Sequence, residues 1–194
     1  MPFYQPGDIV LRDYRIEAFI GEGGFGEVYR AVDLNLREAV VIKILRTDGG
    51  MADRDYEQAR ARFTLEGRLG HRISHPNVVR IYKFAPDEAS GLLVLVMEYI
   101  SGGSLADRLS AGPLAVAEVL RIARQVAAGL SALHAQDVVH RDLKPGNILF
   151  DGAGVARVAD LGLAQPASAL QLSASSLGDG GRLQVSPGTP ASVT

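Results

Sequence analysis

The feature that most constrains this chain is a short span crowded with ionisable and polar residues. It is His140-Arg141-Asp142-Leu143-Lys144-Pro145-Gly146-Asn147, and Asp160-Leu161-Gly162 follows it along the chain. Two carboxylates, an amide and a lysine are therefore grouped around one stretch. A solvated turn can contain any one of these residues, but it rarely contains all of them in this order. We interpret the span as a chemical site rather than a surface loop.

A glycine-rich segment lies far upstream of that span. The residues are Gly21-Glu22-Gly23-Gly24-Phe25-Gly26-Glu27-Val28, between two runs of strand-forming residues. Glycine lets a backbone approach phosphate groups closely and point its N–H groups at them. On this segment alone, a plain hairpin turn is an equally good interpretation. A Rossmann dinucleotide site is disfavoured, because a strand rather than a helix follows the glycines.

A lysine and a glutamate form a second candidate pair. Lys43 lies on an otherwise apolar strand, in the run Val40-Val41-Ile42-Lys43, and Glu66 lies three residues after Phe63 on a predicted helix. Taken alone, such a lysine is more often a solvated charge at a strand edge than a ligand. If Glu66 faces the sheet, the pair gains about 4 kcal/mol at about 4 Å and an effective dielectric of about 20, much of which desolvation cancels. A lysine fixed in this way could hold phosphates in line for attack.

Periodicity predicts the secondary structure. Residues 14–45 alternate strand-forming and turn residues, which predicts three antiparallel strands with a loop near Asn35. Apolar residues at helical spacing predict a helix over 53–73, ended by His75-Pro76. The other predicted features are strands around 79–84 and 92–98, a hinge at Ser101-Gly102-Gly103, and short strands at 148–150 and 155–158 around the Asp151-Gly152 turn.

A second long helix is predicted over 116–135. Its apolar stripe consists of Val119, Ile122, Val126, Leu130 and Leu133. Leu120, Ala123 and Ala127 widen the stripe, so a second packing partner is expected. From 164 to 194 the chain has few charges, no aromatic residue and many serines, glycines and prolines, and we expect this tail to be disordered.

Composition excludes several classes of function. A net charge of −2 argues against nucleic acid as a partner, and the lack of cysteine excludes disulfides and thiolate zinc ligation. The apolar run 92–97 is far shorter than the about 20 residues of a membrane span. The first seven residues do not resemble a secretory signal. We therefore expect a soluble, cytoplasmic chain.

Over residues 14–164 the chain resembles the eukaryotic-type serine/threonine protein kinase family, bacterial kinases included. The resemblance implies an α+β, bilobal protein-kinase-like fold. Its small lobe would be a five-stranded antiparallel sheet with one main helix, and its large lobe would be incomplete and mainly helical. The expected division is 14–100 for the ATP-binding small lobe, 101–163 for the partial large lobe with the catalytic loop, and 164–194 for a partial activation segment.

The resemblance also implies roles for individual residues, with ATP and Mg²⁺ bound. Asp142 would be the catalytic base, Lys144 would touch the transferred phosphate and mark serine/threonine specificity, and Lys43 with its partner Glu66 would hold the α- and β-phosphates. Asn147 and Asp160 would bind magnesium, which prefers hard oxygen ligands. The remaining nucleotide contacts would be Ile20, Gly21, Glu22, Gly23, Gly24, Phe25, Gly26, Val28, the gatekeeper Met97, and the adenine-binding backbone of Glu98 and Ile100.

Two residues of the catalytic span have further interpretations. His140 could be a zinc ligand, but without cysteine or a carboxylate cluster a packed histidine that supports the loop is favoured. By resemblance, Arg141 would pair with a phosphorylated residue of the activation segment. The candidates for that residue are Ser173, Ser175, Ser176, Ser186 and Thr189.

The chain departs from the family pattern at a few positions. Val41 replaces a usual alanine and should crowd the site of adenine. Gly70 stands where the family has a bulky apolar residue, so the packing spine through His140 and Leu161 loses a member unless Leu69 substitutes. Gly67 and Gly70 together should cost the helix up to about 2 kcal/mol relative to alanine. Gly188-Thr189-Pro190-Ala191 resembles the segment just before the family's Ala-Pro-Glu motif, but Ser192-Val193-Thr194 follows in its place, so a truncated product or a fragment of a longer chain is expected.

The predicted function is transfer of the ATP γ-phosphate to serine or threonine hydroxyls of a protein substrate. The alternative is a pseudokinase-like scaffold that binds nucleotide but transfers little, which the missing large-lobe helices favour. A small-molecule phosphotransferase is disfavoured by Lys144 and Pro145. The substrate, the activating signal and the oligomeric state are not predicted.

Overall fold

The structure, a computed structural model, describes residues 2–23, 26–45, 53–161 and 165–166. In the part described, the N-terminal half forms a curled antiparallel sheet of six strands in the order β1-β2-β3-β4-β6-β5. These strands are β1 Ile9–Val10, β2 Tyr14–Gly23, β3 Gly26–Asp33, β4 Ala39–Leu45, β5 Ile81–Pro86 and β6 Leu93–Glu98. The five predicted strands are all present, and β1 is an additional short one.

The sheet closes around an apolar interior. Alternate residues of β3 and β4 point inward, so that Tyr29, Ala31, Ile42 and Ile44 are buried together. Val94 and Val96 of β6 complete this cluster on the other side of β4. The predicted three-strand unit over 14–45 is confirmed, since β2 pairs with β3 and β3 with β4, both antiparallel.

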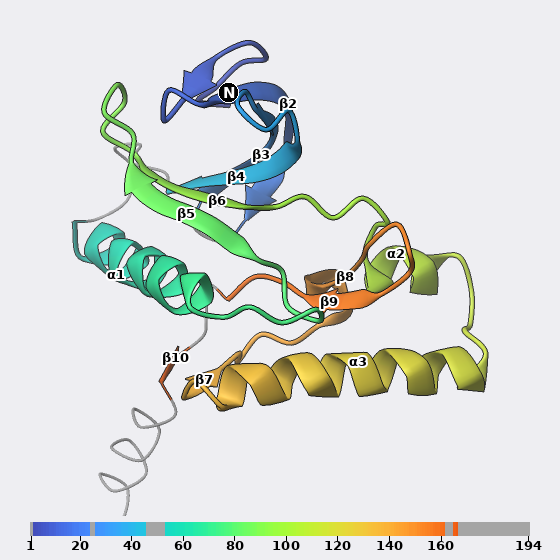
Figure 1. Cartoon of the computed structure of the whole chain (residues 1–194). Coiled ribbons are helices and arrows are strands. Elements are labelled where there is room, and N and C mark those ends of the chain that lie inside the picture. Colours follow the sequence, from blue (N-terminus) through green and yellow to red (C-terminus); the bar gives the residue numbers. More distant parts are fainter. Residues whose placement is uncertain (1, 24–25, 46–52, 162–164, 167–194) are drawn as a thin grey trace, which may run out of the picture.

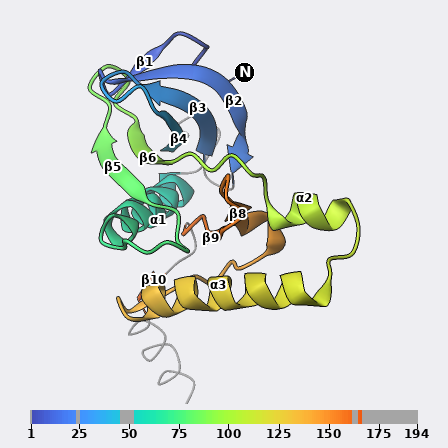
Figure 2. The same cartoon turned by 45° about the vertical axis from the view of Figure 1, so that its right-hand side comes forward.

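One helix packs on the sheet. It is α1, Asp53–His71, which ends two residues before the predicted limit. Ala59 and Phe63 lie in a cluster with Leu45, Ile81 and Leu95, so the helix covers β4, β5 and β6. Figures 1 and 2 show α1 directly below this part of the sheet. The position of α1 brings Glu66 under β4.

The two glycines of α1 lie against β5. A Cβ on Gly67 would lie 2.5 Å from Phe84 Cγ, and a Cβ on Gly70 would lie 2.2 Å from Ile81 Cδ1. The space beside Gly70 is therefore filled by Ile81. Leu69 packs against the cluster that contains Leu161. It therefore lies where it can take the place of the bulky apolar residue that Gly70 lacks. The loss of helix propensity at these glycines is offset by close packing of the helix on the sheet.

Helix propensity alone predicts that alanine in place of either glycine stabilises α1. The contacts with β5 predict the opposite for one of the two substitutions. We expect Gly67→Ala to lower the free energy of unfolding by about 1–3 kcal/mol, because the clash involves Phe84 close to its backbone. Gly70→Ala should be milder, because the tip of Ile81 can rotate away. Urea denaturation of both variants measures the difference, and equal stabilisation of both would contradict this packing.

The large-lobe part is smaller and lies beyond the Ser101–Gly103 segment. Its helices are α2 Leu105–Ser110 and α3 Val116–His134. Its short elements are β7 Val138–Val139, the 3-10 turn η1 Pro145–Asn147, β8 Ile148–Phe150, β9 Ala156–Val158 and β10 Gln165–Pro166. β8 and β9 form the predicted hairpin, which lies between α3 and the sheet in Figures 1 and 2.

Helix α3 buries one face and exposes another. Ile122, Val126 and Leu133 are buried against β7–β9, as predicted. Val119 belongs to the predicted buried stripe but is 48% exposed. Two residues further along α3, Arg121 Nη1 donates to Gly154 O of the hairpin at 2.8 Å. Leu120, on the wider part of the stripe, is 59% exposed. The second partner expected for this face is not present in the part of the chain described.

Over the described ranges, no helix combines the length and the hydropathy needed to cross a bilayer. The disorder predicted for 164–194 concerns residues that, apart from 165–166, lie outside the described ranges.

Candidate active site

Lys43 is fixed between two carboxylates. Its Nζ lies 2.9 Å from Glu66 Oε2, 3.1 Å from Glu66 Oε1 and 3.0 Å from Asp160 Oδ1. Lys43 is only 8% exposed, so the interpretation as a solvated edge charge is wrong. Three elements meet at this ammonium: β4, α1 and the segment after β9.

The electrostatics of this triad favour a charged lysine. Burial by itself would lower the pKa of Lys43, but Glu66 and then Asp160 outweigh it, and the net pKa is raised. Burial raises the pKa of Glu66, against the opposing effect of Lys43. These two shifts disagree: a raised pKa of Lys43 favours the ion pair, whereas a raised pKa of Glu66 disfavours it. Because the ammonium donates to three carboxylate oxygens, we take the ionised pair as the state at neutral pH.

Residues of the span 140–147 form a second, hydrogen-bonded group. Lys144 Nζ donates to Asp142 Oδ2 at 2.7 Å. Asn147 Nδ2 donates to the backbone oxygen of Asp142 at 2.9 Å and to its Oδ2 at 3.1 Å. Asn147 is buried, so the loop is held from inside while Asp142 stays accessible. The carboxylate orientation is therefore set by an amide below it and an ammonium beside it.

Backbone contacts join the two groups. His140 is buried, with Nε2 3.0 Å from Ala159 O and Nδ1 3.3 Å from Asp142 N. Ala159 N donates to Asn147 O at 2.8 Å. These contacts support the packed interpretation of His140, because both ring nitrogens are engaged. They also place Asp160, the residue after Ala159, beside the loop that carries Asp142.

Two residues of this region adopt the left-handed backbone conformation without being glycine. They are Arg141, with φ of 64°, and Asp160, with φ of 61°. Such conformations cost of order 1 kcal/mol or more and persist where surrounding contacts over-determine them, most often at functional sites. Here the contacts of His140, Asn147 and Lys43 supply that constraint.

Comparison with protein families identifies the fold. The family described as Protein kinase domain matches residues 14–179. The chain belongs to the protein kinase family.

Curated relatives of this kinase chain include bacterial serine/threonine-protein kinases. The probable kinase pknA2 of Bifidobacterium longum is 37% identical over 174 residues, which are 89% of this chain and 23% of that protein. The kinase pkn3 of Myxococcus xanthus is 40% identical over 164 residues, 82% and 29% of the two chains. PrkC of Bacillus subtilis is 40% identical over 152 residues, which are 78% of this chain and 22% of that protein. The chain thus spans about a quarter of the length of these relatives.

The structure places the expected nucleotide contacts on the small lobe of the kinase domain. Val28 lies directly opposite Lys43 in the β3–β4 ladder, so the two side chains share one face of the sheet. Gly21 lies opposite Val28 on β2. The other described members are Ile20, exposed, with Glu22 and Gly23 at the end of β2, Gly26 at the start of β3, Met97 and Glu98 at the end of β6, and Ile100 just beyond it.

Several expected kinase residues lie outside the described ranges. They are Gly24 and Phe25 of the glycine-rich turn, and the phosphorylation candidates Ser173, Ser175, Ser176, Ser186 and Thr189. Val41, expected to crowd the adenine, is half-buried in β4 and lies opposite Met97 of β6.

The donor set near Asp160 fits a hard cation. Asp160 keeps 44% of its side chain exposed although Oδ1 accepts from Lys43. Asn147 commits its nitrogen to Asp142, so its carbonyl oxygen is the atom left to face a metal. One carboxylate and one amide oxygen, with phosphates supplying further ligands, match the way proteins hold Mg²⁺.

The sequence did not reveal a contact between the end of β6 and the β8–β9 hairpin of the large lobe. Arg157 Nη1 lies 3.2 Å from Glu98 Oε2, and Nη2 lies 3.0 Å from Asp151 Oδ2. Glu98 was expected to act through its backbone alone. The only signal in the sequence was a charged residue in the strand 155–158, between apolar neighbours, which does not say which of several carboxylates it meets.

The hydrogen bond from Lys144 predicts the titration of Asp142. That bond is the main reason why the pKa of Asp142 lies below its ordinary value of 3.8, with a smaller contribution from Asn147. A lowered pKa keeps the carboxylate ionised, and able to accept a proton, at every pH above 3.8. We expect Lys144→Ala to raise the pKa of Asp142 more than Asn147→Ala does, as measured by carboxyl-carbon NMR titration. An unchanged pKa in Lys144→Ala would contradict the contact.

Proposed function

We propose that this chain forms the ATP-binding and catalytic-loop part of a serine/threonine protein kinase that transfers the ATP γ-phosphate to protein hydroxyls. The observation that carries the proposal is the convergence at Lys43, which bonds Glu66 and Asp160 beside the loop that presents Asp142. Within it we place the small lobe at 14–100, the partial large lobe at 101–163, and the start of the activation segment beyond.

The small-lobe residues have a binding role in this proposal. Lys43, held rigid by Glu66, would contact the α- and β-phosphates. The backbone of 21–26 would donate to the phosphates, and Ile20 and Val28 would cover the nucleotide. Met97, Glu98 and Ile100 would line the adenine site, with hydrogen bonds from the backbone of the last two. A fixed cation and preoriented N–H groups supply the electrostatic part of catalysis.

The catalytic-loop residues have a chemical role. The substrate hydroxyl oxygen forms a bond to the γ-phosphorus while the bond from that phosphorus to the oxygen shared with the β-phosphate breaks, and ADP leaves. Asp142 accepts the hydroxyl proton, which its ionised state permits. Lys144 stays charged beside Asp142 and would reach the transferred phosphate. Asn147 and Asp160 would hold Mg²⁺, which neutralises the charge on the phosphates when bound.

A second candidate is nucleotide binding without transfer. It is favoured by the apolar face of α3 at Val116 and Leu120, which no other described element covers. A chain with this face uncovered could bind nucleotide through its small lobe and still fail to seat a protein substrate.

One experiment separates the two functions. Binding of Mg·ATP is measured by calorimetry, and transfer is followed as labelled phosphate on the chain itself and on a serine/threonine peptide pool. The kinase function predicts that Asp142→Ala abolishes transfer and leaves nucleotide affinity within about threefold. Glu57→Ala, a surface carboxylate on α1, is the matched control. Binding without transfer, with no change in Asp142→Ala, would show the second function.

A further inference from the structure

An N-terminal segment lies over the sheet next to the start of β3. Residues 2–13 precede the family match, which begins at residue 14, and we call them the N-terminal strap. Tyr4 and Val10 of the strap are buried in the same core as Tyr29 of β3. Figures 1 and 2 show the strap crossing the top of the sheet, beside β2 and β3.

The strap bonds a buried carboxylate at the start of β3. Glu27, the residue after Gly26, is only 2% exposed. Phe3 N–H donates to Glu27 Oε2 at 2.8 Å, and the Tyr29 hydroxyl donates to the same oxygen. Tyr4 N–H in turn donates to the Tyr29 hydroxyl at 3.1 Å. A buried carboxylate is costly unless it is hydrogen-bonded, so these donors hold Glu27 in the interior.

The position of Glu27 is coupled to the nucleotide face of the sheet. Glu27 lies opposite Ile44, whereas Val28 lies opposite Lys43. Successive residues of a strand face opposite sides, so Glu27 faces the core while Val28 and Lys43 share the site face. The backbones touch here, since a Cβ on Gly26 would lie 1.8 Å from Ile44 O. If Glu27 turned outward to reach water, the backbone of 26–28 would have to move away from β4.

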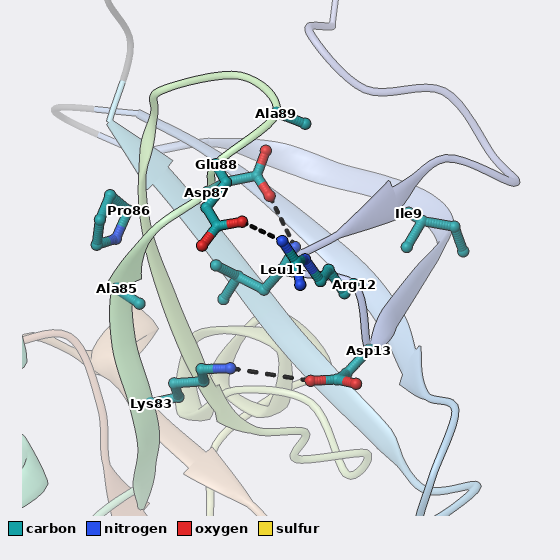
Figure 3. Close-up of a pocket in the computed structure, with 10 residues that line it drawn as sticks. All are labelled: Ile9, Leu11, Arg12, Asp13, Lys83, Ala85, Pro86, Asp87, Glu88 and Ala89. Carbon is teal, nitrogen blue, oxygen red and sulfur yellow. Dashed lines mark hydrogen bonds and ion pairs between the residues drawn. The ribbon is translucent and has the colours of Figure 1, made fainter.

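The other end of the strap is fixed at the β5–β6 turn. At this end, Leu11 N–H donates to Asp87 Oδ1 at 2.9 Å. The Tyr4 hydroxyl, from the first end of the strap, reaches the same turn and lies 2.9 Å from Ser90 Oγ. Figure 3 shows this end, where Arg12 pairs with Glu88 along a groove of about 660 Å³. The strap is thus attached to the sheet at both ends and does not rest on Phe3 alone.

We propose that the N-terminal strap positions residues 26–28, at the start of β3, for phosphate binding, with Phe3 N–H, Tyr29 and Glu27 as positioning residues. They act through the backbone of β3 and touch no nucleotide. The inference rests on the proposed function, because it requires the phosphates of ATP to lie beside the end of β2 and the start of β3, at residues 21–23 and 26–28. It adds to that function a determinant that precedes the matched kinase region.

Two substitutions at one position separate the hydrogen bond from the ring. Phe3→Pro removes the N–H donor, whereas Phe3→Ala keeps the donor and removes the ring, which makes it the matched control. In the whole chain, dissociation constants for Mg·ATP and for adenosine are measured by calorimetry, and the thermal midpoint is measured alongside. We expect Phe3→Pro to weaken Mg·ATP binding by about fivefold to tenfold, and to change adenosine binding by less than about twofold. Phe3→Ala should bind Mg·ATP within about twofold of the unaltered chain.

Tyr29→Phe provides an independent measurement if Phe3→Pro does not fold. It keeps the ring in the core and the Phe3 donor, but removes the hydroxyl that donates to Glu27. We expect the same selective loss of Mg·ATP affinity. Equal losses for ATP and adenosine, unchanged ATP affinity in both variants, or a loss in Phe3→Ala as large as in Phe3→Pro would overturn the inference. An unaltered chain that binds no Mg·ATP would instead refute the proposed function, and the inference with it.

Discussion

The Lys43→Ala variant is expected to lose about 3–5 kcal/mol of unfolding free energy, because it leaves the buried carboxylate of Glu66 without its cation. Urea denaturation at neutral pH measures the loss. The double variant Lys43→Ala/Glu66→Gln is the matched control and should recover part of the stability, since a neutral amide is far cheaper to bury. A loss below about 1 kcal/mol in Lys43→Ala, or no recovery in the double variant, would contradict a buried ion pair.

The same variant should show a larger pH dependence of stability from Glu66, with a definite sign. Burial raises the pKa of Glu66, and Lys43 is the main group that opposes this rise. Without Lys43 the folded pKa stays above the ordinary value of 4.5, so the folded state binds the proton more tightly than the unfolded chain. Stability should therefore be retained below pH 4.5 and lost as pH rises through the raised pKa of Glu66. The double variant, which cannot titrate at this position, should lack that decline.

Asp160→Asn is expected to lower phosphate transfer by at least about a hundredfold, because it removes a carboxylate that we propose holds Mg²⁺ beside the phosphates. The substitution should be tolerated by the fold, since the amide oxygen can still accept from Lys43. Transfer rates, and nucleotide affinities with Mg²⁺ or with excess chelator, are measured on the same preparations.

The metal dependence distinguishes a metal ligand from a structural partner of Lys43. The unaltered chain should lose most of its ATP affinity when Mg²⁺ is chelated, whereas Asp160→Asn should bind ATP weakly in either condition. Glu57→Gln, a surface carboxylate on α1 remote from Lys43, should behave as the unaltered chain does. Asp160→Asn with full Mg²⁺-dependent affinity would show that this carboxylate only anchors the lysine.

Local patterns predicted the elements that carry the site. The alternation over 14–45 and the helical spacing over 53–73 are strong because each extends over many residues, and both became β2–β4 and α1. The catalytic span was recognisable because its residues are adjacent, so their order alone is informative. The pairing of Lys43 with Glu66 was predicted as an option and is present, since Phe63 placed the helix face correctly.

The sequence patterns did not predict very short elements or features that depend on residues far apart in the chain. β1 has two residues, too few for a pattern of alternation. Val10 packs in the cluster that contains Tyr4, whose hydroxyl donates to Asp87, 83 positions along the chain. Val119 was assigned to a buried stripe because periodicity specifies a face of a helix but not the point where its partner begins. The gap expected at Gly70 is filled by Ile81, a residue of another element.

The sequence by itself determined which residue types are available and in what order: a glycine-rich turn between strands, a lysine on an apolar strand, and a loop with aspartate, lysine and asparagine. These follow from rules of backbone geometry and residue spacing that act over a few residues. Tertiary structure alone decided that Lys43 and Asp160, 117 positions apart, lie 3.0 Å from one another, and that Phe3 reaches Glu27. Such pairings depend on how sheet, helix and hairpin pack together, because a buried charge must pair with whichever partner the packing brings within reach. A pattern over a few residues cannot predict that partner.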